Sequence, residues 1–136
     1  MKFAHQFIDI ACSHSDAMAL FADPMRLHEW AIAYCQGVER TSDGFVAQTV
    51  EGPRCFEVRA DRETGIADVM TGSSHDVLDD VLHVRAVPGG PALTLVSLVY
   101  APLGDVPPEV LELMQTGLEA EARHAKELLE GAAAAR

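Results

Sequence analysis

The side chains of this sequence best suited to chemistry are two carboxylates that lie among apolar residues. Asp80 precedes a stretch in which apolar side chains alternate, and Glu121 lies in a helical stretch near the C-terminus. Desolvation favours the protonated form of a buried carboxylate, so such a group can donate a proton or anchor a ligand. We therefore take Asp80 and Glu121 as candidate catalytic residues, each acting as general acid or base.

Each carboxylate also has a purely structural interpretation. A β-bulge near Asp79 and Asp80 would turn the Asp80 side chain toward solvent at the end of its strand. Glu121 lies at the edge of an apolar stripe, where a long side chain can reach water instead of the interior. The sequence leaves both interpretations open.

The usual motifs for metal, disulfide and cofactor chemistry are missing. The histidines show no ligand spacing, and the cysteines form no Cys-x-x-Cys pair; they are His5, His14, His28, His75, His83 and His124 with Cys12, Cys35 and Cys55. The segment Ser74-His75-Asp76 contains the residue types of a catalytic triad, but adjacent residues cannot converge as a triad requires. We therefore expect no metal, no cofactor and three ordinary thiols.

Composition limits the class of protein and its partners. A chain of 136 residues with 49% hydrophobic and 23% charged residues predicts one globular domain spanning residues 1–136. The formal net charge of -11 repels phosphate backbones, so nucleic acid is not expected as a partner. The longest apolar stretch, residues 92–103, is too short to span a membrane, and no secretory signal is recognisable. We expect a cytoplasmic protein.

The order of predicted elements favours an antiparallel sheet. We expect a strand at residues 3–10, a short helix at 16–22 and a second short helix that begins at Pro24. Turn residues then separate six strands, and the segments between them are too short for crossover helices; the strands are residues 35–42, 45–51, 54–61, 66–71, 76–87 and 92–101.

A long amphipathic helix is predicted after Pro107 and Pro108. Its apolar stripe has helical spacing: Leu111, Met114, Leu118, Ala122, Ala125 and Leu129. Gly131 can end the helix, which leaves residues 132–136 to fray. The small side chains at Gly117, Ala122 and Ala125 leave either room for a ligand or a close contact with the sheet.

A two-residue loop at Gly89-Gly90 would set the register of the last two strands. Val87 would then pair with Ala92, and directly opposed residues share a face. The apolar face would carry Leu78, Asp80, Leu82, Val84 and Ala86 opposite Leu93, Leu95, Ser97 and Val99, while Tyr100 would point to the other side. A slip of one residue would invert this assignment.

The order of strand, two short helices, six strands and long helix resembles the START-like, SRPBCC superfamily, which includes polyketide cyclases and Bet v 1-like proteins. The most specific likeness is the segment Phe21-Ala22-Asp23-Pro24-Met25-Arg26-Leu27-His28-Glu29-Trp30, and Leu128-Leu129-Glu130 is similar to the closing helix of that superfamily. The sequence departs from the pattern at residues 11–15, where no proline introduces the first helix.

This resemblance implies an α+β helix-grip fold, in which a curved antiparallel sheet of about seven strands wraps around the long C-terminal helix. It also implies an internal cavity for a small apolar or amphipathic molecule. The predicted ligand-binding residues are Trp30, Tyr34, Phe56, Val58, Asp80, Leu82, Leu95, Ser97, Gly117, Leu118 and Glu121. Trp30 and Tyr34 could stand at the mouth of the cavity, although plain core packing also explains Trp30.

Three functions are compatible with this pattern. The leading hypothesis is binding of a small hydrophobic or amphipathic molecule in the cavity. The candidate polar groups that orient it are Asp80, Ser97 and either Tyr100 or Tyr34. The alternative is an enzyme of the polyketide cyclase or dehydratase kind that uses Asp80 or Glu121 on a bound carbonyl compound. A third hypothesis is a protein-interaction module like the co-chaperone members of the superfamily, and a homodimer is left open.

Overall fold

The computed structural model describes residues 2–136 and confirms the predicted order of elements. The helices are α1 (His14–Phe21), the 3-10 turn η1 (Pro24–Arg26), α2 (Leu27–Trp30) and α3 (Pro108–Ala134). The strands are β1 (Ala4–Ile10), β2 (Gly37–Thr41), β3 (Gly44–Thr49), β4 (Gly52–Asp61), β5 (Ile66–Gly72), β6 (Asp80–Gly90) and β7 (Leu93–Tyr100).

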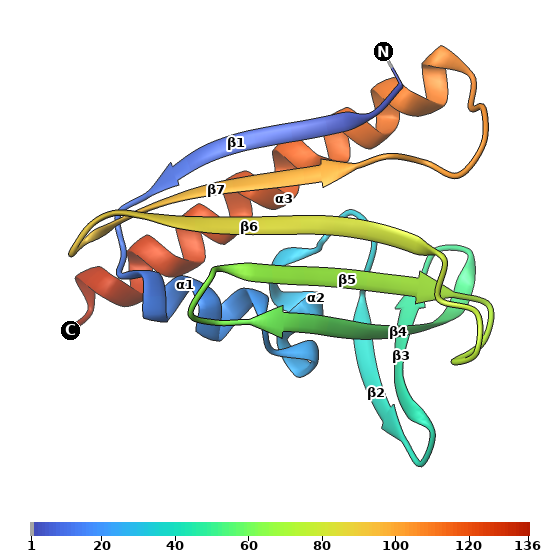
Figure 1. The fold of residues 1–136 in the computed structure, drawn as a ribbon, viewed down its shortest axis with the longest axis horizontal. Helices are drawn as coiled ribbons and strands as arrows, with labels where there is room; N and C mark the ends of the chain where they lie inside the picture. The colour runs from blue at the N-terminus through green and yellow to red at the C-terminus, as the bar shows by residue number, and fades with distance from the viewer. Residues whose placement is uncertain (1) are drawn as a thin grey trace.

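The strands form one antiparallel sheet in the order β1-β7-β6-β5-β4-β3-β2. Figure 1 shows that the sheet curves strongly, so that the β2–β3 hairpin runs across the direction of β6 and β7. Helix α3 runs alongside β1 and β7, while α1 and α2 lie behind β4 and β5 (Figure 1). The predicted helix-grip arrangement of curved sheet, short helices and long C-terminal helix is therefore confirmed.

The short helices begin where side chains cap them. Ser13 caps α1, since its hydroxyl accepts a hydrogen bond of 3.1 Å from the Asp16 amide. Asp23 caps η1 in the same way, with 2.9 Å between its carboxylate and the Met25 amide. A serine cap thus starts the first helix where the sequence offers no proline.

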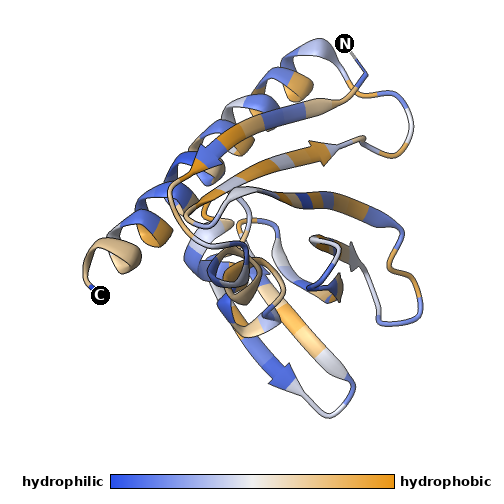
Figure 2. Ribbon diagram, turned by 60° about the vertical axis from the view of Figure 1, so that its left-hand side comes forward, coloured by the Kyte–Doolittle hydropathy of each residue, from blue (hydrophilic) through white to orange (hydrophobic). Residues whose placement is uncertain are grey.

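The core lies on the concave side of the sheet. Phe21 of α1 and Trp30 of α2 meet edge to face, with ring centroids 5.1 Å apart, and both side chains are buried. Figure 2 shows hydrophobic bands alternating with hydrophilic ones along α3, as expected for a helix with one buried stripe. The buried members of that stripe are Leu111, Leu118, Ala122, Ala125 and Leu129.

The prediction that Gly131 ends the last helix is wrong. Helix α3 continues to Ala134, because residues 132–134 are alanines, which have the highest helix propensity and outweigh the cost of one exposed glycine. Arg136 then forms an ion pair with Asp16 near the start of α1. The C-terminal segment is therefore tied to α1 instead of frayed.

The predicted register of the β6–β7 hairpin is also wrong. The strands are joined at Pro91-Ala92, and a bulge at Gly89 shifts the pairing, so that Val87 lies opposite Leu95 instead of Ala92. A shift by an odd number of residues inverts the face of one strand. The concave face of β7 therefore carries Thr94, Val96, Leu98 and Tyr100.

The strand predicted at residues 76–87 begins later, at Asp80. Residues 73–79 fold back on the end of β5 instead, with an isolated bridge between Ser74 and Val77. A side chain at Gly72 would collide with the Val77 carbonyl oxygen, since a Cβ there would lie only 1.6 Å from it. Glycine at this position therefore permits the turn that leads into β6.

Helix α3 covers the free edge of β1 with a polar side chain. Gln115 accepts a hydrogen bond of 3.0 Å from the His5 amide and donates one of 2.6 Å to the His5 carbonyl oxygen. An unpaired strand edge is a template for aggregation, and here a side chain takes the place of a neighbouring strand.

Replacing Gln115 with alanine is expected to lower the free energy of unfolding by roughly 1–3 kcal/mol, because two backbone groups lose their partners. Urea denaturation of Gln115→Ala measures this loss. Glu119→Ala, an exposed position on the same helix, is the matched control and should change stability little. Equal effects of the two substitutions would contradict the bridging role of Gln115.

Candidate functional site

A cavity of about 640 Å³ lies between the sheet, the short helix α2 and helix α3. Its inner wall is apolar, and several of the side chains that form it are almost fully buried. The wall consists of Leu27, Ala31, Val69, Leu82, Met114 and Leu118. This volume and lining are typical of a site for a small molecule with an apolar body.

The rim of the cavity carries apolar side chains that face solvent. Val50, in the turn between β3 and β4, is 85% exposed, and Leu113 on α3 is 72% exposed. Val110 completes this apolar side of the rim from the first turn of α3. The turn at Val50 and the start of α3 therefore mark where the cavity opens.

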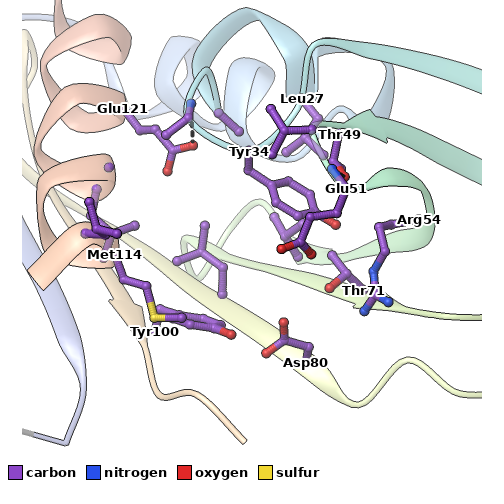
Figure 3. Close-up of a pocket in the computed structure, with 18 of the residues that line it drawn as sticks. Leu27, Tyr34, Thr49, Glu51, Arg54, Thr71, Asp80, Tyr100, Met114 and Glu121 are labelled. Atoms are coloured by element: carbon purple, nitrogen blue, oxygen red, sulfur yellow. Dashed lines mark hydrogen bonds between the residues drawn. The ribbon is translucent and has the colours of Figure 1, made fainter. Parts of the chain in front are cut away.

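One end of the cavity is polar, and neighbouring strands build it together. Arg54 of β4, Thr71 of β5, Asp80 of β6 and Tyr100 of β7 each contribute one side chain. Thr71 lies directly opposite Asp80, and Tyr100 lies opposite Leu82, which shares the face of Asp80. Tyr34, from the segment after α2, reaches this group from above the sheet (Figure 3).

Two atoms at the polar end are buried without a hydrogen-bond partner within residues 2–136. They are the Tyr34 hydroxyl oxygen and Oδ1 of Asp80. Buried polar atoms are nearly always paired, so each such atom calls for an explanation. A ligand that enters the cavity would meet both atoms, because both residues line it.

Burial and charge hold both tyrosines at the polar end in the neutral form. Burial raises the pKa of Tyr34, and it raises the pKa of Tyr100 further, with a contribution from the neighbouring Asp80 carboxylate. In Figure 3 the Tyr100 hydroxyl points toward Asp80. Both phenols can therefore donate a hydrogen bond at neutral pH.

Glu121 contributes a second polar group, on the side of the cavity formed by α3. It is only 4% exposed, and its Oε2 accepts a hydrogen bond of 3.2 Å from the Ala33 amide. Burial raises the pKa of Glu121 to about 7, against an ordinary value of 4.5. This carboxyl group points inward and is poised to give or take a proton near neutral pH.

Close packing is the main reason why residue 117 is a glycine. A Cβ at this position would lie 3.2 Å from the Ala33 side chain, so the helix and the segment after α2 meet there. Ala122 and Ala125 are buried and lie outside the cavity wall, as expected for tight contacts. Of the three small residues only Gly117 borders the cavity.

The structure brings together only part of the predicted ligand-binding set. Tyr34, Asp80, Leu82, Gly117, Leu118 and Glu121 line the cavity. Trp30, Phe56 and Val58 belong to the surrounding core instead. The bulge that would have turned Asp80 to solvent lies at Gly89, so Asp80 keeps regular pairing and faces inward.

The inward placement predicted for Leu95 and Ser97 is wrong. Both residues lie on the convex face of the sheet, beside Phe7 and Val87 in a shallow hollow. The physical reason is the inverted face of β7 described above.

Arg54, Thr71, Met114 and Tyr100 are cavity residues that the sequence-based prediction did not include. Arg54 could have been found, because it lies two residues before the buried Phe56 and therefore shares its face. Tyr100 was considered as a polar group of the site, but the predicted hairpin register assigned it to the wrong face. The sequence offered no comparable signal for Thr71.

Two kinds of feature were not found in the part of the chain that the structure describes. Among residues 2–136, no group of three or more His, Cys, Asp or Glu side chains is arranged to hold a metal ion. In the same part of the chain, no helix is both long enough and apolar enough to cross a membrane.

The sequence matches no family model and no curated protein. Solved structures resemble the chain closely in shape. A START superfamily protein from Mycobacterium smegmatis has a TM-score of 0.71 at 18% identity, covering 95% of this chain and 97% of its own. The Aha1 dimer from Colwellia psychrerythraea gives 0.70 at 12% identity, with 96% and 97% covered.

A third similar structure is the di-domain ARO/CYC protein BexL from the BE-7585A biosynthetic pathway. It has a TM-score of 0.69 at 16% identity, and the match covers 93% of this chain and 46% of that one. At these identities the likeness establishes the fold. The chain has the START-like, helix-grip fold that its sequence resembles.

Proposed function

We propose, from a START-like fold built around this cavity, that the protein binds a small hydrophobic or amphipathic molecule between its sheet and α3. The observation that carries this proposal is the cavity of about 640 Å³, with an apolar inner wall and buried, unpartnered polar atoms on Tyr34 and Asp80. An apolar body with a polar end would satisfy both parts of such a site.

Thermal-shift screening with aromatic polyketides and fatty acids tests this proposal. A ligand that binds only the folded state at a concentration of about 100 times its Kd stabilises that state by roughly 2.7 kcal/mol, which raises the Tm by several degrees. Failure of every compound to raise the Tm would count against a small-molecule site and favour the protein-interaction hypothesis.

A cyclase-like or dehydratase-like enzyme is the second candidate, and Glu121 is the observation that favours it. A general acid or base works best when its pKa lies near the working pH, and burial raises the pKa of Glu121 to about 7. Asp80, next to Tyr100 at the other end of the cavity, would hold the compound in place by accepting a hydrogen bond from one of its hydroxyl groups.

For this second candidate, we expect the rate of any turnover found with a cavity ligand to depend on an ionisation near pH 7. Glu121→Gln should remove that ionisation and lower kcat, whereas Glu119→Gln, on the exposed side of α3, should leave both unchanged. The pH profile of kcat is the measurement. An unchanged profile in Glu121→Gln would exclude Glu121 as the acid or base.

A further inference from the structure

The polar end of the cavity contains an arginine that forms no ion pair in the described part of the chain, although the carboxylates of Glu51 and Asp80 line the same cavity. Arg54 is half-buried, and within residues 2–136 its guanidinium takes part in none of the ion pairs. Arg59, five residues further along the same strand, is paired with Glu57. In Figure 3 the Arg54 guanidinium lies beside Thr71 at the end of a site that Tyr34 also lines, and it retains hydrogen-bond donors for a ligand.

The polar groups at this end of the cavity differ in whether they donate or accept hydrogen bonds. Arg54 can only donate hydrogen bonds, and the neutral Tyr34 hydroxyl can donate one as well. Oδ1 of Asp80 can only accept while the carboxylate is ionised. Tyr100 points toward Asp80 and can donate to one of its carboxylate oxygens, so a ligand that satisfies the remaining groups presents an oxygen acceptor to Arg54 and Tyr34 and a donor to Oδ1 of Asp80.

The sheet separates these two requirements in space. Arg54 is on β4 and Asp80 is on β6, with β5 and its buried Thr71 between them. Neighbouring strands lie about 4.8 Å apart, so the acceptor and the donor must sit on different atoms of the ligand. A single carboxylate or a single hydroxyl group would satisfy only one side.

We propose that the cavity selects amphipathic hydroxy-carbonyl compounds: the carbonyl or carboxylate oxygen binds Arg54 and Tyr34, and a separate hydroxyl group donates to Asp80. The apolar body of the ligand then extends toward Leu82 and Leu118. This inference rests on the proposed function, since it names the ligand class for the same cavity.

Fluorescence titration with a matched set of naphthalenes tests the proposal. The set comprises a naphthoic acid with a hydroxyl group meta to the carboxylate, the same acid without the hydroxyl, the naphthol without the carboxylate, and the hydroxy methyl ketone. The meta position prevents an internal hydrogen bond.

We expect the hydroxy acid or the hydroxy ketone to bind about tenfold more tightly than either singly substituted compound, because one good hydrogen bond provides a difference of this size. Their relative affinities separate the anionic carboxylate from the neutral carbonyl.

Variants assign the two contacts. Arg54→Met should weaken binding of the carboxylate and ketone compounds about tenfold and leave the naphthol within about twofold, and Arg54→Lys should restore part of the loss. Asp80→Ala, which removes the acceptor, should remove the advantage of the hydroxyl group. Arg59→Met, an exposed arginine on the same strand, is the control and should change nothing. Circular dichroism and the Tm without ligand establish that each variant is folded.

The outcomes separate this proposal from the proposed function. Equal affinity of all the naphthalenes, unchanged in Arg54→Met, would overturn the selection of hydroxy-carbonyl compounds while leaving a binding cavity. Absence of binding by all the naphthalenes, by fatty acids and by aromatic polyketides would overturn the proposed function itself.

Discussion

Replacing Glu121 with glutamine is expected to stabilise the protein by roughly 3 kcal/mol at pH 8 and by little at pH 4. The pKa of Glu121 is about 7 in the folded state against an ordinary value of 4.5, and each pKa unit corresponds to ~1.4 kcal/mol. Glutamine resembles the protonated acid in shape and still accepts the hydrogen bond from the Ala33 amide.

Proton linkage explains why the stability gained by Glu121→Gln grows as the pH rises. Below pH 4.5 both the folded and the unfolded chain hold the Glu121 proton, so the ionisation has no effect on stability. Between pH 4.5 and about 7 only the folded state keeps the proton, so the stability that protonation provides is lost progressively as pH rises. Above pH 7 the buried carboxylate is ionised and the full penalty applies.

Urea denaturation of wild type and Glu121→Gln at intervals from pH 4 to pH 8 measures this difference. The gap between the two proteins should open over the window from 4.5 to 7 and then stay constant. Glu119→Gln, exposed on the same helix, should show no such window. A gap that is the same at every pH would mean that Glu121 does not ionise in this range.

Replacing Leu82 with tryptophan is expected to weaken binding of any cavity ligand about a hundredfold or more, corresponding to ~3 kcal/mol. Leu82 belongs to the apolar inner wall of the cavity and lies on β6, two residues after Asp80 of the polar end. An indole ring at this position would occupy space that the ligand needs.

The matched control is Val81→Trp. Val81 is the neighbouring residue on β6 and pairs with Met70 on the opposite face of the sheet, so a larger side chain there leaves the cavity unchanged. Titration of both variants with the tightest compound from the screen is the measurement. Wild-type affinity in Leu82→Trp would place the ligand elsewhere, with the hollow beside Phe7 and Leu95 as the next site to test.

The elements and their order could be read from the sequence because their signals are local. The stripe from Leu111 to Leu129 has the period of a helix, and α3 has its buried residues at those positions. Pro24 and the turn residues between the strands lie where one helix or strand ends and the next begins. Alternation within a single strand also predicts that Asp80 and Leu82 share a face, although it does not exclude a bulge that would turn Asp80 to solvent.

The composition of the site was decided by contacts between segments far apart in the sequence. The register between β6 and β7 depends on a single turn. Because of the bulge at Gly89, Tyr100 lies on the cavity side of β7 and Ser97 lies on the opposite side. The direction of Glu121 depends on the angle at which α3 packs, since a residue at the edge of an apolar stripe can face either way. The Ala33 amide donates a hydrogen bond to the Glu121 carboxylate, and the position of this amide is set by the segment that follows α2.

The sequence by itself therefore determined which segments are strands and helices, and it made Asp80 a candidate for an apolar face without deciding between the cavity and solvent. Only the tertiary structure decided that Arg54, Thr71, Asp80 and Tyr100 meet at one end of a cavity. The reason is that periodicity fixes which side of its own element a residue occupies, whereas the residues it meets depend on pairing and packing between elements.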